Sequence, residues 1–265
     1  MIIDTHTHVY PEAVAAKATE NLGHFYDFTV DGKGTLADLT EKEKRAGIGG
    51  FFLLGVATTP HQVTKVNDAI AAAVTKAKEE GFFAVGFGGM HQNYPDFPGE
   101  LSRMRALGLR GVKIHPDIQG VEIDSPLLFP LYEEMQGKMP VYLHVGDDRP
   151  ECRFSEPRRI LNILDNFPRL TVVAAHFGGY RVWDEGVQTL SGRENLWFDS
   201  SSSLWAMTPG HAVSLLRKLG TDRVFFGSDY PVTDPGDELK SFEKLPLTDR
   251  EREDILSENA RRFLG

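Results

Sequence analysis

Short apolar runs recur along the chain, and longer segments with apolar residues at helical spacing separate them. The run at 51–54, Phe-Phe-Leu-Leu, has no polar alternation, which is typical of a strand buried on both faces. In the following segment, Val63, Val66, Ile70 and Val74 recur every three or four positions, the spacing of one helix face. These two patterns predict eight strands, at residues 2–8, 48–57, 82–90, 109–115, 140–145, 170–175, 196–199 and 223–226. Helices are predicted at residues 11–22, 35–46, 60–80, 95–107, 126–138, 156–167 and 209–219, and another begins at about residue 181. The chain closes with further helices, and the last of them begins at Thr248 with a capping box.

Eight strands that are each followed by a helix indicate an α/β protein with a parallel sheet, because parallel neighbours need a crossover connection. A closed (β/α)₈ TIM barrel typically needs about 250 residues, close to the 265 present. An open doubly wound sheet is the alternative, but no Gly-x-Gly-x-x-Gly follows the first strand to bind a dinucleotide. We therefore expect residues 1–265 to form a single barrel domain, with its chemistry at the C-terminal ends of the strands.

One predicted connection is longer than the others. Residues 23–34 contain two bounding glycines and the aromatic residues Phe25, Tyr26 and Phe28. A long loop in a compact domain is often functional, so this segment is a candidate substrate lid.

The composition narrows the class of partner. Lys and Arg number 29 against 38 Asp and Glu, a formal charge of -9, which disfavours nucleic acid or an anionic membrane and leaves a small molecule as the expected partner. The single cysteine, Cys152, excludes an internal disulfide, and no apolar run has the length of a membrane span or the form of a signal segment. We expect a cytoplasmic protein, and the sequence leaves open whether it forms a homo-oligomer.

The first predicted strand carries a candidate metal clamp. In Ile2-Ile3-Asp4-Thr5-His6-Thr7-His8, the two histidines share a strand face because side chains alternate along an extended chain. Two imidazoles can bind zinc or another divalent transition metal, but they leave half of its coordination shell to other residues.

Matching groups lie at the ends of other predicted strands. Six of the nine histidines lie there, namely His6, His8, His91, His115, His144 and His176, and Asp229 ends the eighth strand. His6, His8, His144 and Asp229 would form a four-ligand set of nitrogen and oxygen atoms around the barrel axis. Such a set with room for a water is typical of a catalytic metal site.

The strand-end motifs resemble those of the amidohydrolase-related, metal-dependent TIM-barrel hydrolases. The motifs follow family order and span nearly the whole chain: His6-Thr-His8, the Lys113-Ile-His115-Pro segment, His144, His176-Phe-Gly-Gly, Gly227-Ser-Asp229-Tyr-Pro and the closing Asn259-Ala-Arg-Arg-Phe-Leu. The chain is similar to the aminocarboxymuconate-semialdehyde decarboxylase branch of that superfamily. The resemblance implies one divalent metal, most often zinc, held by His6, His8, His144 and Asp229. It also implies that His176 acts beside the metal-activated water as an acid, a base or a hydrogen-bonding group.

Catalytic roles follow for two of these residues. Asp229 can hold a water and collect its proton, and His176 can orient that water or stabilise charge on a substrate oxygen. Lys113 and His115 share a strand face, and a modified Lys113 would make the site binuclear. We favour one metal, with Lys113 attracting an anionic substrate and His115 hydrogen-bonding around the site, because an unmodified ammonium repels a cation.

Substrate contacts are predicted from three further residues. Arg149 and Arg153, in the loop after the fifth strand, could form a fork for a carboxylate, and Tyr230 could add an aromatic wall. A solvated loop and packing at the barrel rim are the alternatives for these residues.

Two enzymatic functions fit the ligand set. The leading one is hydrolysis of a small ester, lactone or amide by metal-activated water. The alternative is metal-dependent, non-oxidative decarboxylation of a small unsaturated or aromatic acid, a carbon-carbon lyase reaction. The intact ligand set argues against a third possibility, a barrel that has lost its activity and only binds a ligand. A TatD-like nuclease also begins with a His-x-His strand, but the acidic charge fits it less well.

Overall fold

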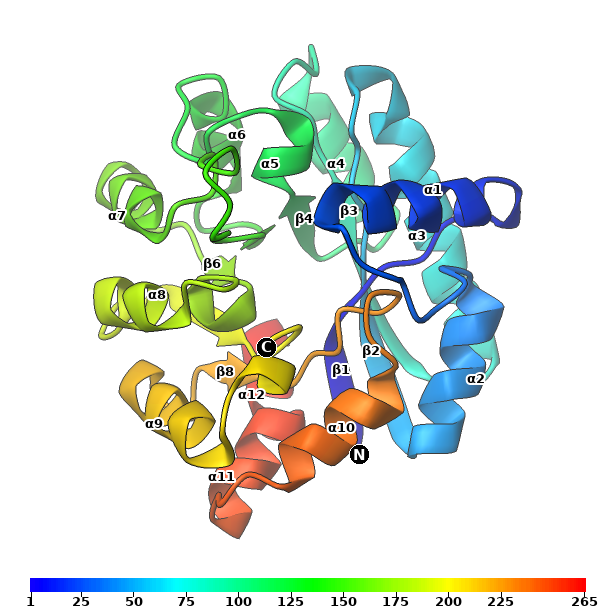
Figure 1. Ribbon diagram of the computed structural model, residues 1–265. Coiled ribbons are helices and arrows are strands. Elements are labelled where there is room, and N and C mark those ends of the chain that lie inside the picture. The colour runs from blue at the N-terminus through cyan, green and yellow to red at the C-terminus, as the bar shows by residue number, and fades with distance from the viewer.

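The computed structural model describes residues 1–265 and confirms the predicted barrel. Its strands form one parallel sheet in the order β1 to β8. The ring closes where β1 returns to β8: the Thr5 amide donates to the Phe226 carbonyl at 2.9 Å, and Thr7 pairs with Tyr230 in a parallel bridge. Figure 1 shows the helices as an outer ring around these strands.

The strands are short, and each helix returns the chain to the start of the next strand. The strands are β1 (Ile2–Thr7), β2 (Ile48–Leu54), β3 (Phe83–Gly89), β4 (Gly111–Ile114), β5 (Val141–Leu143), β6 (Val172–Ala174), β7 (Leu196–Asp199) and β8 (Val224–Phe225). The α-helices are α1 (Glu12–Tyr26), α2 (Leu36–Ala46), α3 (Val63–Glu79), α4 (Phe97–Ala106), α5 (Pro116–Gln119), α6 (Phe129–Met135), α7 (Pro157–Asn166), α8 (Trp183–Leu190), α9 (Pro209–Leu219), α10 (Pro235–Glu243), α11 (Asp249–Glu253) and α12 (Asn259–Leu264). Single 3₁₀ turns lie at Pro60–Gln62, His176–Gly178 and Leu204–Ala206, and a π-helical turn, Asp254–Glu258, joins α11 to α12. None of the helices combines the length and the apolar character that crossing a membrane requires.

Two apolar layers hold the barrel together. A cluster of 55 buried residues fills the space between the strands and the surrounding helices, whereas a cluster of 10 occupies the inside of the barrel. Phe263 of α12 packs against the rings of Phe87, Trp197 and Phe225 at the inner cluster. The inside of the barrel is therefore packed, as in other barrels of this kind, and a group of polar side chains lies where the strands end.

The first helix is longer than predicted. Helix α1 continues through Gly23 to Tyr26 and ends at Asp27, which adopts a left-handed conformation with φ of 55°. One glycine costs a helix only about 1 kcal/mol relative to alanine, too little to end it when the following turn is packed. Phe25 and Tyr26 therefore belong to a helix end, and only Phe28 lies in a loop.

Candidate metal centre

Three predicted ligands from β1 and the segment after β8 meet at the mouth of the barrel. His6 lies in β1, His8 follows its last residue, and Asp229 follows β8. The His6 and His8 Nε2 atoms are 3.2 Å apart, and Asp229 Oδ1 lies 3.3 Å from the first and 3.5 Å from the second. Two nitrogen atoms and one carboxylate oxygen thus converge on a common point.

The partners of the other ring nitrogens determine which atoms carry protons. His6 Nδ1 lies 2.9 Å from Asp199 Oδ2, and His8 Nδ1 lies 2.7 Å from the Leu54 carbonyl oxygen. Both oxygens accept, so each Nδ1 carries a proton and donates it. Because burial lowers the pKa of His6 to about 3, its ring is neutral and its Nε2 presents a lone pair. Burial alone would raise the pKa of Asp229, but the neighbouring histidines His6, His8 and His176 hold it below its usual range, so its oxygen is anionic. These electron-pair donors fit a divalent cation.

Asp229 and His176 both have an unusual backbone. Their φ angles are 65° and 59°, in the left-handed region that few residues other than glycine adopt. Ser202 Oγ donates to Asp229 Oδ2 at 2.7 Å and fixes the carboxylate orientation. Such conformations cluster at functional sites, where surrounding contacts hold them in place.

His176 and His144 form a second pair beside the first. His176 Nδ1 lies 3.0 Å from the Ser201 carbonyl oxygen, and its Nε2 lies 3.0 Å from His144 Nδ1. The His176 ring stacks on His6 with 5.0 Å between ring centroids, so it borders the metal centre. His144 contacts His176 rather than the point where His6, His8 and Asp229 meet, and its role as fourth ligand stays a prediction.

The two residues singled out around β4 both face this site. Lys113 is buried, its Nζ is 3.2 Å from His6 Nε2, and burial lowers its pKa to about 8. The His115 ring stacks on His144 with 4.1 Å between centroids, and burial lowers the pKa of His115 well below its usual value. Both residues therefore border the site, and their roles toward a substrate or the ligand side chains stay predictions.

The other predicted substrate contacts lie further out. Arg149 forms a two-point ion pair with Asp147, and Arg153, whose side chain is 70% exposed, donates to the Pro150 carbonyl. The two guanidinium groups thus have separate partners and do not form a fork. The Tyr230 hydroxyl donates to Asp38 at 2.7 Å, which directs it toward the start of α2 rather than the metal centre. A substrate role for these residues remains a prediction.

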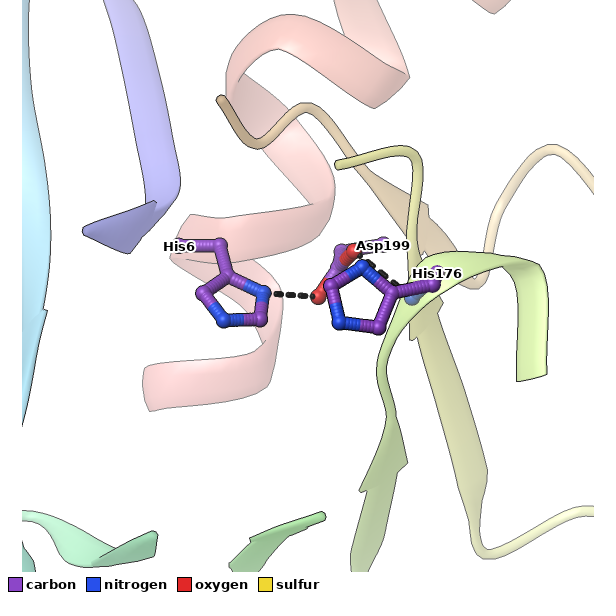
Figure 2. Close-up of side chains that lie close together, drawn as sticks. All are labelled: His6, His176 and Asp199. Carbon is purple, nitrogen blue, oxygen red and sulfur yellow. Dashed lines mark hydrogen bonds and ion pairs between the residues drawn. The ribbon is translucent and has the colours of Figure 1, made fainter. Parts of the chain in front are cut away.

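Asp199, at the end of β7, was not among the predicted site residues. Its carboxylate lies between two site histidines (Figure 2): Oδ2 accepts from His6, and Oδ1 accepts from the His176 amide at 3.0 Å. Tyr142 and Ser201 donate to it as well, at 2.5 Å and 2.6 Å. Burial favours the neutral acid, but His6, His176 and these hydrogen bonds outweigh it and hold the pKa of Asp199 well below its usual range. Its place at the end of a barrel strand was the signal that could have identified it.

A family model matches this chain over nearly its full length, and a curated protein matches 60% of it. A model of the amidohydrolase family matches residues 3–265. Among curated proteins, the chain is 27% identical over 201 residues to a 2-amino-3-carboxymuconate-6-semialdehyde decarboxylase of Dictyostelium discoideum. That match covers 60% of this chain and 54% of the relative, so the chain spans about half the length of the relative.

Solved structures share the fold at low identity. An uncharacterised TIM-barrel protein from Bordetella bronchiseptica aligns with a TM-score of 0.79 and 23% identity over 99% of this chain and 98% of its own. A 5-carboxyvanillate decarboxylase from Novosphingobium aromaticivorans, solved with bound manganese, aligns with a TM-score of 0.73 and 17% identity over 100% and 97%. A candidate 2-pyrone-4,6-dicarboxylic acid hydrolase from Pseudomonas putida aligns with a TM-score of 0.70 and 19% identity over 100% and 97%. The predicted family resemblance is confirmed. The leading prediction of hydrolysis is not, and decarboxylation is the better supported of the two activities.

Proposed function

The chain belongs to the amidohydrolase family, and we propose that it is a metal-dependent decarboxylase of a small unsaturated or aromatic acid. The observation that carries this proposal is the convergence of the His6 and His8 Nε2 atoms on the anionic Asp229 at the mouth of the barrel. The curated relative and one structural neighbour named above are decarboxylases, which favours this activity among those that the family contains.

We assign the metal to His6, His8 and Asp229, with His144 as the fourth ligand. Zinc suits imidazole and carboxylate ligands, and manganese is the metal present in one structural neighbour. When bound, a divalent ion supplies a Lewis acid that polarises a substrate oxygen and neutralises negative charge on it. We favour one ion, because the Lys113 ammonium, 3.2 Å from His6 Nε2, would repel a second cation.

The reaction needs a proton at the carbon that loses its carboxyl group. The bond to the carboxyl carbon breaks, carbon dioxide leaves, and the electron pair left on the substrate carbon takes up a proton. This proton comes from solvent, and Asp229 and His176 transfer it to the carbon: Asp229 Oδ2 is held by Ser202, and His176 Nε2 faces His144 Nδ1. The buried cation of Lys113 would attract the acid group of the substrate.

Hydrolysis of a small ester, lactone or amide is the second candidate. The same three ligands would serve it, Asp229 would collect the proton of a water, and the neighbour from Pseudomonas putida supports it. The product distinguishes the two reactions, because decarboxylation releases carbon dioxide and hydrolysis does not.

The test is a panel of hydroxybenzoic and unsaturated acids, together with lactones and esters, incubated with protein loaded with zinc or manganese in D₂O. We expect carbon dioxide from at least one acid and one deuterium at the carbon that carried the carboxyl group. Asp229→Asn and His176→Asn should each lower the rate by about 10²- to 10⁴-fold, the usual contribution of a positioned acid or base. Asp165→Asn, which changes an exposed residue of α7, serves as the matched control. Turnover of lactones or esters with no carbon dioxide from any acid would replace decarboxylation by hydrolysis.

A further inference from the structure

Helix α1 lies over the β3 side of the barrel, and little of its surface is buried. In Figure 1 it lies in front of the ring of strands, on the side of β3 and β4. Among its 15 residues, Ala15 alone is buried. A helix with so little buried surface is held mainly by its ends, because burial of apolar area is the main source of packing energy.

The last turn of α1 reaches the metal centre. The Tyr26 hydroxyl oxygen lies 2.7 Å from His115 Nε2 and 3.5 Å from His144 Nε2. The Tyr26 ring packs edge-on against Tyr180, with 5.7 Å between centroids, and stacks on Phe28. Tyr26 thus covers two of the site histidines.

Arg149 fastens this turn to the barrel. Its guanidinium donates to the Phe25 carbonyl at the end of α1 and lies 4.7 Å from the centre of the Phe25 ring. The same group is held by Asp147, whose side chain is 1% exposed, through bonds of 2.9 Å and 2.7 Å. A cation at a helix C-terminus is also favoured by the helix dipole. Arg149 therefore connects a fixed carboxylate to the end of a weakly attached helix.

The hydrogen bonds around Tyr26 leave its proton free for a ligand. His115 Nδ1 accepts from the Ile118 amide, so the proton of the neutral His115 ring is on Nε2 and is donated to the Tyr26 oxygen. His144 Nε2 lies nearer to the Gly146 carbonyl, at 3.2 Å, than to Tyr26. The Tyr26 O–H is consequently a donor without a close acceptor, beside the buried histidines.

We propose that α1 is a lid, that Arg149 is its latch, and that Tyr26 binds the substrate when the lid is closed. His6, His115, His144 and His176 are all less than 10% exposed, and Tyr26 lies against His115 and His144, so movement of α1 would uncover these two histidines. With the lid closed, the Tyr26 hydroxyl donates to an oxygen of the substrate acid. The substrate class rests on the proposed function, whereas the motion of α1 does not.

Hydrogen–deuterium exchange on the full chain tests the latch. Arg149→Met should speed exchange of amides in the last two turns of α1 by about tenfold, the effect of losing about 1.4 kcal/mol. Exchange in β1 to β8 should not change. Arg158→Met, which changes an exposed arginine of α7, is the matched control. Unchanged exchange of α1 in Arg149→Met would reject the lid.

Binding of 2-hydroxybenzoate to the metal-loaded protein, measured by calorimetry, tests Tyr26. Tyr26→Phe removes only the hydroxyl, and we expect the dissociation constant to rise about tenfold, as for loss of a hydrogen bond to a charged group. Tyr94→Phe, after β3 and outside the cluster of site histidines, should bind like the wild type. Equal affinity in Tyr26→Phe, or no binding by the wild type, would reject the role of Tyr26. If the probe binds through Tyr26 but no acid releases carbon dioxide, the proposed decarboxylation fails and the lid stands.

Discussion

At the scale of single residues, His6 is contacted by a different carboxylate at each ring nitrogen. Asp199 accepts the Nδ1 proton, and Asp229 faces the Nε2 lone pair. The first contact fixes the tautomer in which Nε2 carries no proton and can bind a metal, and the anionic partner makes the ring a better donor. Asp199 would thus act on a bound metal through His6.

Loss of the Asp199 charge should lower the affinity of the site for its metal. We expect Asp199→Asn to lower the affinity for manganese or zinc by about 10- to 100-fold, the usual effect of removing such a partner. Titration of the metal-free protein with each ion measures this affinity. Exposed Asp165→Asn should leave it unchanged. Equal affinity in Asp199→Asn would mean that His6 does not need its carboxylate to bind the metal.

The residues of the site could be predicted to different degrees. His6 and His8 follow from alternation along one strand, and Asp229 follows from its position at a strand end. The contacts of Asp199 could not be predicted, because its partners are 193 and 23 positions away in the chain. Nor could the sequence show that Arg149 donates hydrogen bonds to Asp147 and to the Phe25 carbonyl, since these contacts depend on where α1 ends.

At the scale of elements, α2 places a buried carboxylic acid, Glu43, next to β1, the strand that carries His6. Glu43 of α2 is fully buried, and neither of its carboxyl oxygens has a hydrogen-bond partner. Burial, followed by the nearby charge of Asp4 in β1, raises the pKa of Glu43 well above its usual value. Glu43 is therefore protonated in the folded protein at pH values where it is ionised in the unfolded chain.

This difference makes stability depend on pH in a known direction. Because the pKa of Glu43 is higher in the folded protein than in the unfolded chain, its protonation favours the folded state. This contribution to stability is complete below the unfolded pKa of 4.5 and is lost as the pH rises toward the folded pKa. We expect the wild type to lose stability relative to Glu43→Gln as pH rises above about 5, by at most about 1.4 kcal/mol per pH unit. Urea denaturation at several pH values measures this. Exposed Glu41→Gln should follow the wild type, and a pH profile of Glu43→Gln parallel to that of the wild type would contradict the assignment.

The order of elements was easier to predict than their ends. Apolar runs identified every strand, but β5 has three residues and β8 has two, because strand ends depend on pairing with neighbours rather than on local composition. The short helix α5, directly after β4, was missed. It is a four-residue helix from Pro116 to Gln119 that is capped by Gly120, too short for a periodic pattern.

At the scale of the whole molecule, closure of the barrel assembles the site. The two ends of the sheet, β1 and β8, meet through the Thr5 amide and the Thr7–Tyr230 bridge, and this brings Asp229 to His6 and His8 from more than 220 positions away. The repeated strand-helix pattern was enough to predict this closure. The reaction could not be predicted from it, because the fold and the candidate ligand set fit both decarboxylation and hydrolysis.

The metal content of the protein tests the central claim most directly. The protein is loaded with zinc or manganese, dialysed and analysed by mass spectrometry for metal per chain, alongside His8→Ala and the exposed-residue control His24→Ala. We expect about one ion per chain in the wild type and in His24→Ala, and almost none in His8→Ala. A wild type that retains no metal, or a His8→Ala variant that retains as much as the wild type, would contradict the site of His6, His8 and Asp229.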